Sequence, residues 1–284
     1  EAEQAVVLNI RLPRIACAAL VGAALSTAGA SYQGMFRNPM VSPDLLGAST
    51  GAGFGAALAI LLSFHYLGIT VMAFCFGLGA VFLAYTVSRM SRMESTLSMV
   101  LSGVMISSLF SAGTSFVKLV ADTEDQLPAI TYWLMGSLSS VKGRDTLFAL
   151  VPIAVGLIPL VLLRWRVNLL TISESEARSM GLNTDRLRFV VIICATLVPS
   201  ASVAVSGMIG WVGLIVPHFC RMIFGNDNCY VVPASIVSGA LFMLIVDTLA
   251  RCATASEIPV SILTAVIGAP VFIVLLRGTG GLDG

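Results

Sequence analysis

Charged residues are scarce in this sequence. Only 11% of its 284 residues are Asp, Glu, Lys or Arg, whereas 57% are hydrophobic and the mean hydropathy is +0.95. A soluble domain carries about 25% charged residues, so the composition excludes an ordinary soluble protein and indicates an integral membrane protein. The net charge of +1 also gives no reason to expect a nucleic acid or another polyanion as a partner.

The sequence also lacks the signatures of an ATPase, a metal centre and a disulfide framework. No Walker A motif occurs, so any ATP hydrolysis must belong to another polypeptide. The two histidines, His65 and His218, are far apart, and the six cysteines form no Cys-x-x-Cys pair. We therefore expect no metal site, no cofactor and no catalytic residue, and we expect the cysteines to pack as small apolar side chains.

Long windows without charge predict the membrane spans. A helix needs about 20 apolar residues to cross the hydrocarbon of a bilayer. The window 45–88 is long enough for two spans with a turn at 63–68. The window 189–220 contains one span and, after a break at 206–210, a shorter span. We therefore predict an all-α bundle with nine spans. The windows are 15–36, 45–88, 95–117, 146–163, 189–220, 228–246 and 258–276.

The distribution of basic residues orients these spans. If the loops alternate between the two sides of the membrane, one side holds ten basic residues and the other holds six. Cytoplasmic loops carry the excess of Lys and Arg, so the side with ten is predicted to be cytoplasmic and the N-terminus to lie outside. An outside N-terminus requires a signal sequence or a preceding span, and we therefore expect a segment upstream of this sequence.

The most charged stretch, 164–188, separates two apolar halves of the chain. It holds eight charged residues on the predicted cytoplasmic side. Ser173, followed three residues later by Glu176, is the pattern of a helix capping box, and Gly181 is placed to end the same helix. We expect a short, water-exposed helix here, which a soluble partner can contact.

Small residues predict where helices approach one another closely. The first span contains the run 22–29, which is rich in Gly, Ala and Ser, and Gly47, Gly51 and Gly55 form a double Gly-x-x-x-Gly pattern. Both patterns favour close packing of membrane helices.

The ionisable residues near the outer ends of spans allow two interpretations. Arg11 and Arg14 can extend to the lipid headgroups, or they can receive an acidic partner from outside. Asp247 and Arg251 lie four residues apart, so they are either a functional site or a mutually satisfied pair, which Glu257 could complete.

The order of features in the first half of the chain is repeated in the second half. A basic flank, an apolar span, a glycine-rich break and a proline motif occur in 11–118 and again in 186–277, with the membrane orientation reversed. Inverted repeats of this kind are typical of transporters, whose substrate path lies where the repeats meet. We predict one transmembrane domain over 1–284, with these two repeat halves and the cytoplasmic region 164–188 between them.

Seven motifs along the chain together resemble the FecCD-type permeases, the membrane subunits of bacterial ATP-driven importers for vitamin B12, haem and ferric siderophores. The family has ten spans and a cytoplasmic N-terminus, so the chain resembles it without the first span. It departs from the family's usual residues at 225–229 and at Ser261. The motifs are Arg11-Leu-Pro-Arg14, Arg37-Asn-Pro-Met-x-x-Pro43, Leu46-Gly47, Trp133-x-x-Gly-Ser137, Glu174-x-Glu-Ala-Arg-x-x-Gly181, Gly213-Leu-Ile-x-Pro-His218 and Gly268-Ala-Pro-x-Phe272.

The resemblance implies a set of partners and a cargo. In the family, two permease subunits pair around a central path, two ATP-binding subunits dock on the cytoplasmic side, and a periplasmic or lipid-anchored binding protein delivers the substrate. It implies a multi-pass protein of the inner or plasma membrane of a bacterium or archaeon, without enzymatic activity of its own. The implied cargo is a metal chelate, with a ferric siderophore or haem as the first choice. Vitamin B12 and oxyanions such as molybdate are the second choice.

The resemblance also implies roles for individual residues. Arg11, Arg14 and Arg251 match positions that receive acidic residues of the binding protein. A second set matches the cytoplasmic gate of the vitamin B12 relative: Met40, Thr96 and Leu97. A third set matches the coupling helix, which sits in the cleft of the ATPase: Ser173, Glu174, Glu176, Ala177, Arg178 and Gly181.

Two other classes of protein compete with this interpretation. A secondary transporter driven by an ion gradient needs ionisable residues near the middle of the bilayer, but the span centres carry essentially no carboxylates and Asp247 lies near a span end. A membrane enzyme needs clustered His, Asp or Glu at a membrane face, which two isolated histidines do not provide. The secondary transporter stays the alternative.

Overall fold

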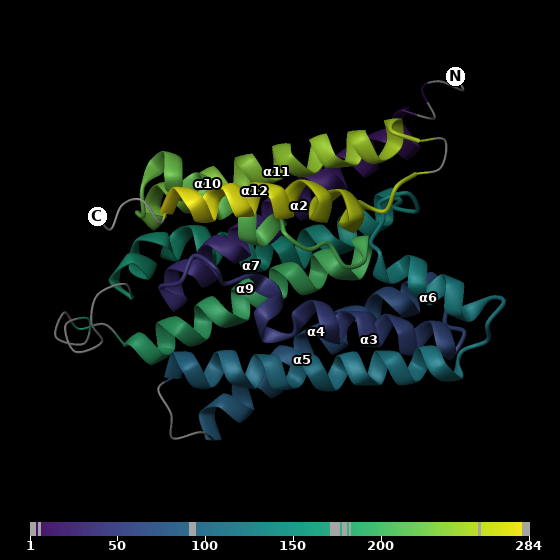
Figure 1. Ribbon diagram of the computed structural model, residues 1–284, viewed down its shortest axis with the longest axis horizontal. Coiled ribbons are helices and arrows are strands. Elements are labelled where there is room, and N and C mark those ends of the chain that lie inside the picture. The colour runs from purple at the N-terminus through teal and green to yellow at the C-terminus, as the bar shows by residue number, and fades with distance from the viewer. Residues whose placement is uncertain are drawn as a thin grey trace.

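The computed structural model is helical, with no β-strand among the residues that it describes (Figure 1). These residues are 4, 7–90, 95–170, 177, 181, 183–254 and 257–279, of which 95–96 and 274–279 are described by their backbone alone. The elements in chain order are η1 (Val7–Arg11), α2 (Leu12–Phe36), η2 (Pro43–Leu46), α3 (Ala48–Leu61), α4 (Tyr66–Met90), α5 (Ser95–Val120), α6 (Gln126–Leu134), α7 (Gly143–Leu169), α9 (Thr184–Ser206), α10 (Val212–Phe224), α11 (Asn228–Cys252) and α12 (Val260–Thr279).

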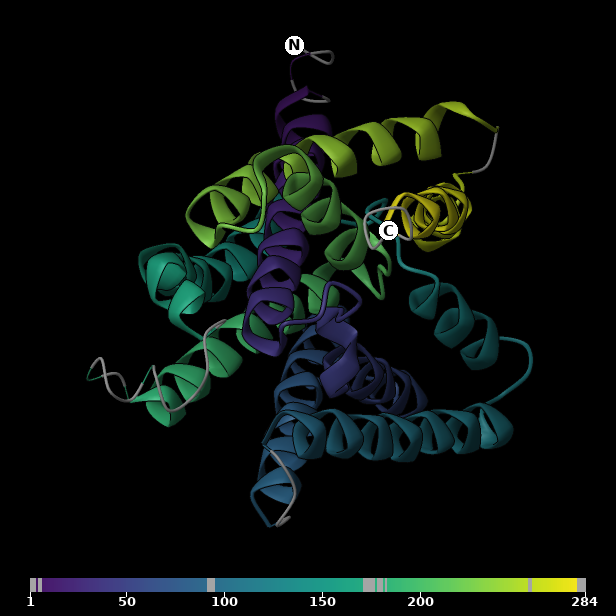
Figure 2. The same ribbon diagram turned by 60° about the vertical axis from the view of Figure 1, so that its left-hand side comes forward.

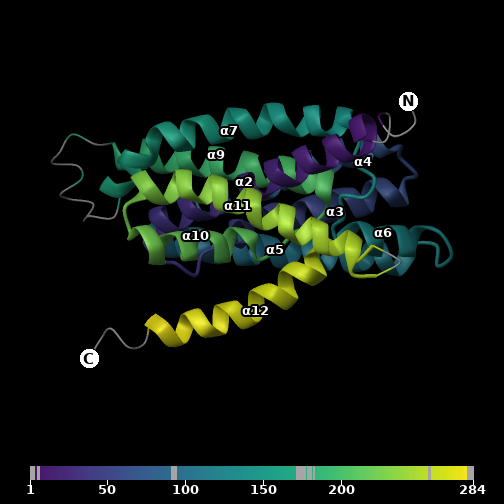
Figure 3. The same ribbon diagram turned by 90° about the horizontal axis from the view of Figure 1, so that it is seen from above.

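Successive long helices run in alternate directions, so their connections gather at two ends of the bundle (Figures 1 and 3). We call the end with the start of α2, the α3–α4 turn and α6 the outer face, and the opposite end the inner face. Hydrogen bonds join the outer connections to one another: Gln126 Nε2 donates to the Leu61 carbonyl (3.1 Å), and Ser137 N–H donates to the Ser206 carbonyl (2.8 Å). The grouping of loops expected from the sequence is confirmed.

Each of the nine predicted spans falls on a helix, but the helices are not equal in length. Among the described residues, six helices are long and apolar enough to cross a membrane. The apolar helices α3, α10 and the first part of α12 are shorter. The 14 residues of α3 cover only about 21 Å at 1.5 Å per residue, against a hydrocarbon core of about 30 Å. The nine predicted spans are therefore unequal. Helix α10 is the shorter span expected after the break at 206–210, whereas the short length of α3 was not expected, because the charge-free window also includes the non-helical break before it.

These breaks have local causes. Helix α2 ends at Phe36 because Arg37 adopts a left-handed conformation (φ 52°) just before the Asn-Pro motif. Helix α9 ends at Ser206 because Gly207 has a φ of 69°, and α10 begins at Val212. Both breaks lie where the proline and glycine motifs predicted them.

Helix α2 passes through the middle of the bundle (Figure 2, purple) and is enclosed by α7, α9, α10 and α11. Every residue from Val21 to Phe36 is buried. Close approach is possible because a Cβ at Gly22 would overlap the Gly239 carbonyl of α11, and a Cβ at Gly29 would overlap the Gly213 carbonyl of α10. The packing role predicted for the small residues of this span is confirmed.

The double Gly-x-x-x-Gly pattern serves the contact between α3 and α4. A Cβ at Gly51 would lie 2.6 Å from the Phe76 carbonyl, and a Cβ at Gly55 would lie 2.5 Å from the Met72 carbonyl. Gly47 has another task, since its φ of 86° lets the chain turn from η2 into α3. Helix packing therefore explains two of the three glycines, and a tight turn explains the third.

Gly29→Ala should lower the melting temperature of the protein in detergent by several degrees. The new methyl group fits only if α2 and α10 move apart, and overpacking of this kind costs about 1–3 kcal/mol. Gly79→Ala is the matched control, because a Cβ at Gly79 meets nothing within 4 Å. Circular dichroism melting curves compare the two variants, and equal melting temperatures would contradict the packing argument.

Candidate functional site

Four ionised side chains at the outer face form what we call the outer ion cluster: Arg14, Asp247, Arg251 and Glu257. Nε and Nη2 of Arg14 both lie 2.9 Å from Oδ1 of Asp247, and Nη1 lies 2.8 Å from Oε1 of Glu257. Arg251, one helical turn after Asp247, places Nε 3.2 Å from the second carboxylate oxygen of Asp247. Of the two interpretations of Asp247 and Arg251, the structure shows the ion pair, and it brings Glu257 into the same cluster. The sequence did not indicate that Arg14 joins Asp247 to Glu257.

The outer ion cluster is largely buried. Asp247 is 1% exposed and Arg14 is 7% exposed. Buried charges are tolerated only when they are paired and hydrogen-bonded, so these two side chains neutralise each other and hold the first turn of α2 against the end of α11. Arg14 consequently offers little surface to another protein, whereas Arg11 is exposed and the Arg251 side chain remains 29% accessible.

The outer face has no excess of positive charge among the described residues. Six cations are matched by six carboxylates, so a partner would be guided by the local pattern of charges rather than by a net field. The cations are Arg11, Arg14, Lys118, Lys142, Arg144 and Arg251, and the carboxylates are Asp122, Glu124, Asp125, Asp145, Asp247 and Glu257.

The Trp133-x-x-Gly-Ser137 motif forms a strap across the outer face. Gly136 has a φ of 67°, which turns the chain after α6. The Ser137 N–H donates to the Ser206 carbonyl at the end of α9 (2.8 Å), and the Gly136 carbonyl accepts from the Val260 N–H at the start of α12 (3.0 Å). The motif thereby joins the break after α9 to the beginning of the last helix.

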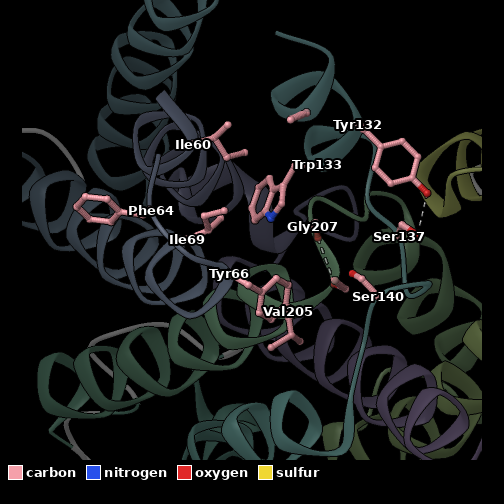
Figure 4. A pocket seen from close by; sticks show the side chains of 12 residues that line it. Ile60, Phe64, Tyr66, Ile69, Tyr132, Trp133, Ser137, Ser140, Val205 and Gly207 are labelled. Carbon is pink, nitrogen blue, oxygen red and sulfur yellow. Dashed lines mark hydrogen bonds between the residues drawn. The ribbon is translucent and has the colours of Figure 1, made fainter. Parts of the chain in front are cut away.

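A cavity of about 330 Å³ lies beside this strap (Figure 4). Aromatic side chains line it from the α3–α4 turn and from α6, namely Phe64, Tyr66, Tyr132 and Trp133. The serine hydroxyls come from the strap and from the end of α9. The described residues that line the cavity include no charged side chain. Such a lining suits an apolar or aromatic group better than an ion.

Most of the predicted coupling helix lies outside the described residues, including Ser173, Glu174, Glu176 and Arg178. Of its two described members, Ala177 is buried and Gly181 has a φ of 77°. A left-handed glycine is common just after the end of a helix, but the helix that Gly181 would end lies outside the described residues, so its role stays a prediction. Immediately after this region, Asn183 caps α9 by accepting a hydrogen bond from the Arg186 N–H (3.0 Å).

A network of polar side chains lies at the inner face, around the end of α7 and just before the predicted coupling helix. Asn168, on the last turn of α7, donates to Asp227 Oδ1 (2.6 Å) and accepts from the backbone and side-chain N–H groups of Asn228 (both 2.8 Å). Arg221 of α10 donates to Asn228 Oδ1 and to the Ala30 carbonyl (both 3.0 Å). We call Gln33, Asn168, Arg221, Asp227 and Asn228 the inner polar network, because Arg221 Nε also lies 3.4 Å from Gln33 Oε1.

The inner polar network ties the end of α7 to α2, α10 and α11. A further hydrogen bond, from Arg37 Nε to the Leu170 carbonyl (2.8 Å), holds the last described residue of the segment that leads to the predicted coupling helix. The sequence indicated this site only through its departure from the family pattern at 225–229. Its members were not predicted as functional residues, since four separate segments contribute to it.

Asp227→Ala should destabilise the protein, because Asp227 caps α11 by accepting from the Cys229 N–H (2.8 Å). Loss of an N-cap costs about 0.5–2 kcal/mol. Asp227→Asn keeps an acceptor oxygen and should lose much less. Melting curves in detergent at neutral pH measure both variants, and equal losses would show that the cap contributes nothing.

The advantage of the native protein over Asp227→Asn should depend on pH. Hydrogen bonds from the Cys229 N–H and then from Asn168 lower the pKa of the Asp227 carboxyl. A carboxylate with a lowered pKa contributes its full stability above the unfolded pKa of about 3.9 and loses it as the pH falls through the folded pKa. The difference in melting temperature between the two proteins should therefore shrink on acidification, and an unchanged difference well below pH 3.9 would contradict this.

The residues matched to the cytoplasmic gate lie at the inner face. Met40 is exposed in the connection between α2 and η2, and Leu97 is exposed on the first turn of α5. Thr96 precedes Leu97 on the same helix, and its side chain lies outside the described part of the structure. Their role as a gate stays a prediction.

The architecture defines a class of protein. A multi-pass bundle of apolar helices, packed through small residues around α2, is that of an integral membrane protein. Comparison with known proteins identifies the family, because the model of the FecCD transport family matches residues 1–278. The chain belongs to the FecCD transport family, and the resemblance noted in the sequence is confirmed.

Three relatives illustrate the comparison. The molybdate import system permease protein MolB of Haemophilus influenzae is 42% identical over 96% of this chain and 81% of its own length. A probable iron chelatin transport system permease of Helicobacter pylori is also 42% identical, over 98% of this chain and 84% of its own. A solved chain from a metal-chelate type ABC transporter in an inward-facing conformation has a TM-score of 0.94 and 42% identity, covering 98% of this chain and 89% of that one.

Proposed function

We propose that this chain forms, as a homodimer, the translocation path of an ABC importer for a metal chelate. The cargo is a ferric siderophore or haem, or else vitamin B12. A binding protein delivers it from outside, two separate ATP-binding subunits drive transport, and the complex lies in the inner or plasma membrane. The observation that carries the proposal is the likeness of almost the entire chain to a metal-chelate type ABC transporter, with a TM-score of 0.94.

The choice of a metal chelate over an oxyanion as the cargo is based on the cavity of about 330 Å³ beside the strap, which we call the outer cavity. Relatives with equal identity are named for molybdate and for iron chelatin, so identity alone does not rank the two cargoes. Oxyanions are normally bound by Arg, Lys or converging backbone N–H groups. The outer cavity has aromatic and apolar walls with neutral hydroxyls, which suit the apolar rim of a bulky chelate.

The proposed mechanism transmits motion from the ATP-binding subunits through the inner polar network. Closure of these subunits would shift the coupling helix. Just before it, Leu170 is bonded to Arg37 at the end of α2, and Asn168 is bonded to Asp227 and Asn228 at the start of α11, where Arg221 of α10 joins them. Since the helices are closely packed, they would move as rigid elements between inward-open and outward-open states. Opening and closing would occur at Met40, Thr96 and Leu97.

Docking of the binding protein is proposed to use Arg11 and Arg251 directly, with Arg14 in a supporting role. Arg11 is exposed and Arg251 is partly accessible, whereas Arg14 is already paired with Asp247 and Glu257. Arg14 would therefore hold Glu257 and the end of α11 in position beside the docking residues.

Uptake into vesicles tests the proposed function. The permease co-purified with its ATP-binding subunits should give a complex of two permease and two ATP-binding subunits by native mass spectrometry. Reconstituted vesicles should accumulate a ferric siderophore only with ATP and the binding protein.

Glu174→Ala with Glu176→Ala should abolish uptake while ATP hydrolysis continues, since the coupling helix would no longer engage the ATP-binding subunits. Asp122→Ala with Glu124→Ala, on the outer face, is the matched control and should transport normally. A permease that stays alone and transports under an ion gradient without ATP would establish the secondary transporter instead.

Charge reversal tests the docking surface. Arg11→Glu with Arg251→Glu should weaken the affinity for the binding protein about 2- to 30-fold, because exposed ion pairs contribute about 0.2–1 kcal/mol each. The loss should decrease at high salt. Lys142→Glu, on the same face, is the control, and Arg14→Gln should lower the melting temperature more than the affinity. Unchanged affinity of the double variant at low salt would remove these arginines from the docking surface.

A further inference from the structure

An apolar groove runs between α4 and α9 on the surface of the bundle. Its volume is about 230 Å³. The residues that form its walls are spaced three and four apart on both helices, so they lie along one face of each helix and the groove runs parallel to the helix axes. Phe82 is 70% exposed and Ile193 is 48% exposed, so the groove opens on the outside of the bundle. The eight residues that line it are Leu78, Val81, Phe82, Tyr85, Phe189, Ile192, Ile193 and Thr196.

The groove has almost no polar surface that would require water. The Thr196 hydroxyl is already bonded to the Tyr32 hydroxyl of α2 (2.7 Å), inside the bundle. The remaining walls are aliphatic and aromatic carbon, apart from the Tyr85 hydroxyl. A hydrocarbon chain is the occupant that such a surface favours within a bilayer.

The inner end of the groove is basic. Tyr85 and Phe189 meet there with their ring centroids 5.4 Å apart. One turn further along the same faces lie Arg89 on α4 and both Asp185 and Arg186 on α9. Of these three described side chains, two are cations and one is a carboxylate, so together they carry a charge of +1 at this end of the groove.

The existing ion pair at this end is weak. Nη1 of Arg89 lies 3.7 Å from Oδ1 of Asp185, and the two side chains are 61% and 52% exposed. Exposed pairs at this separation contribute little to stability. Arg89 can therefore turn toward an anion in the headgroup region without disturbing the packing of α4 on α9.

We propose that this groove binds an anionic glycerophospholipid, with an acyl chain between α4 and α9 and its phosphate at Arg89 and Arg186. The apolar groove matches the acyl chain of such a lipid, and the two arginines match its phosphate. Basic sites between membrane helices on the cytoplasmic side are typical of anionic headgroup binding. A zwitterionic lipid gains less, because its own ammonium group opposes the arginines. The site lies directly after the coupling region, and bound lipid would stabilise the contact between α4 and α9.

Native mass spectrometry of the purified protein tests the headgroup half of the site. Delipidated protein is mixed with phosphatidylglycerol or with phosphatidylcholine of the same acyl chains, and the retained lipid is counted. Phosphatidylglycerol should be retained in preference, and Arg89→Gln with Arg186→Gln should weaken its retention roughly tenfold or more. Arg164→Gln with Arg166→Gln, at the inner end of α7, is the matched control and should retain lipid as the native protein does. Equal retention of the two lipids, or undiminished retention by the first double variant, would overturn the proposal.

Two further variants test the acyl half. Ile193→Trp and Leu78→Trp each fill the groove from one wall and leave both arginines in place, so both should lose phosphatidylglycerol while their melting temperatures stay close to the native value. Retention by either well-folded variant would overturn the groove as the acyl site. A photoreactive amino acid at position 193 distinguishes the occupant in intact membranes. Cross-linking to lipid supports the proposal, whereas cross-linking to a second copy of this chain or to another polypeptide would overturn it.

Discussion

The contact of α2 with α10 and α11 is the constraint on which the rest of the structure depends. Gly22 meets the backbone of Gly239, and Gly29 meets that of Gly213, so side chains larger than hydrogen are excluded at both points. In a membrane the hydrophobic effect does not drive helices together, and close backbone contact supplies van der Waals attraction instead. The buried length of α2 therefore acts as the axis around which α7, α9, α10 and α11 are arranged.

Because α2 is held along its length, it connects the two ends of the molecule. Its outer end carries Arg14, which is paired with Asp247 and Glu257. Its inner end carries Gln33 and Arg37, which contact Arg221 and the Leu170 carbonyl. In the proposed mechanism, a movement applied at the end of α7 would reach the outer ion cluster through this one helix.

The two polar sites show how far sequence reasoning extends. Asp247 and Arg251 were identified because helical residues four apart share a face, and this spacing is a local property. The pairing of Arg14 with Asp247 joins residues 233 positions apart, and the inner polar network joins α2, α7, α10 and α11. No spacing along the chain encodes such contacts, so Arg14 resembled an exposed docking residue although the fold buries it.

The sequence by itself determined the class of the protein, the number and order of its apolar helices, the breaks at Arg37 and Gly207, and the family. These features follow from composition, local backbone preference and short motifs, which do not depend on distant residues. The tertiary structure alone decided which apolar helices are long enough to span, which arginines are buried, and that α4 and α9 leave a groove whose inner end is basic. These features depend on the distances between helices, and those distances are set by packing between residues that lie far apart in the chain.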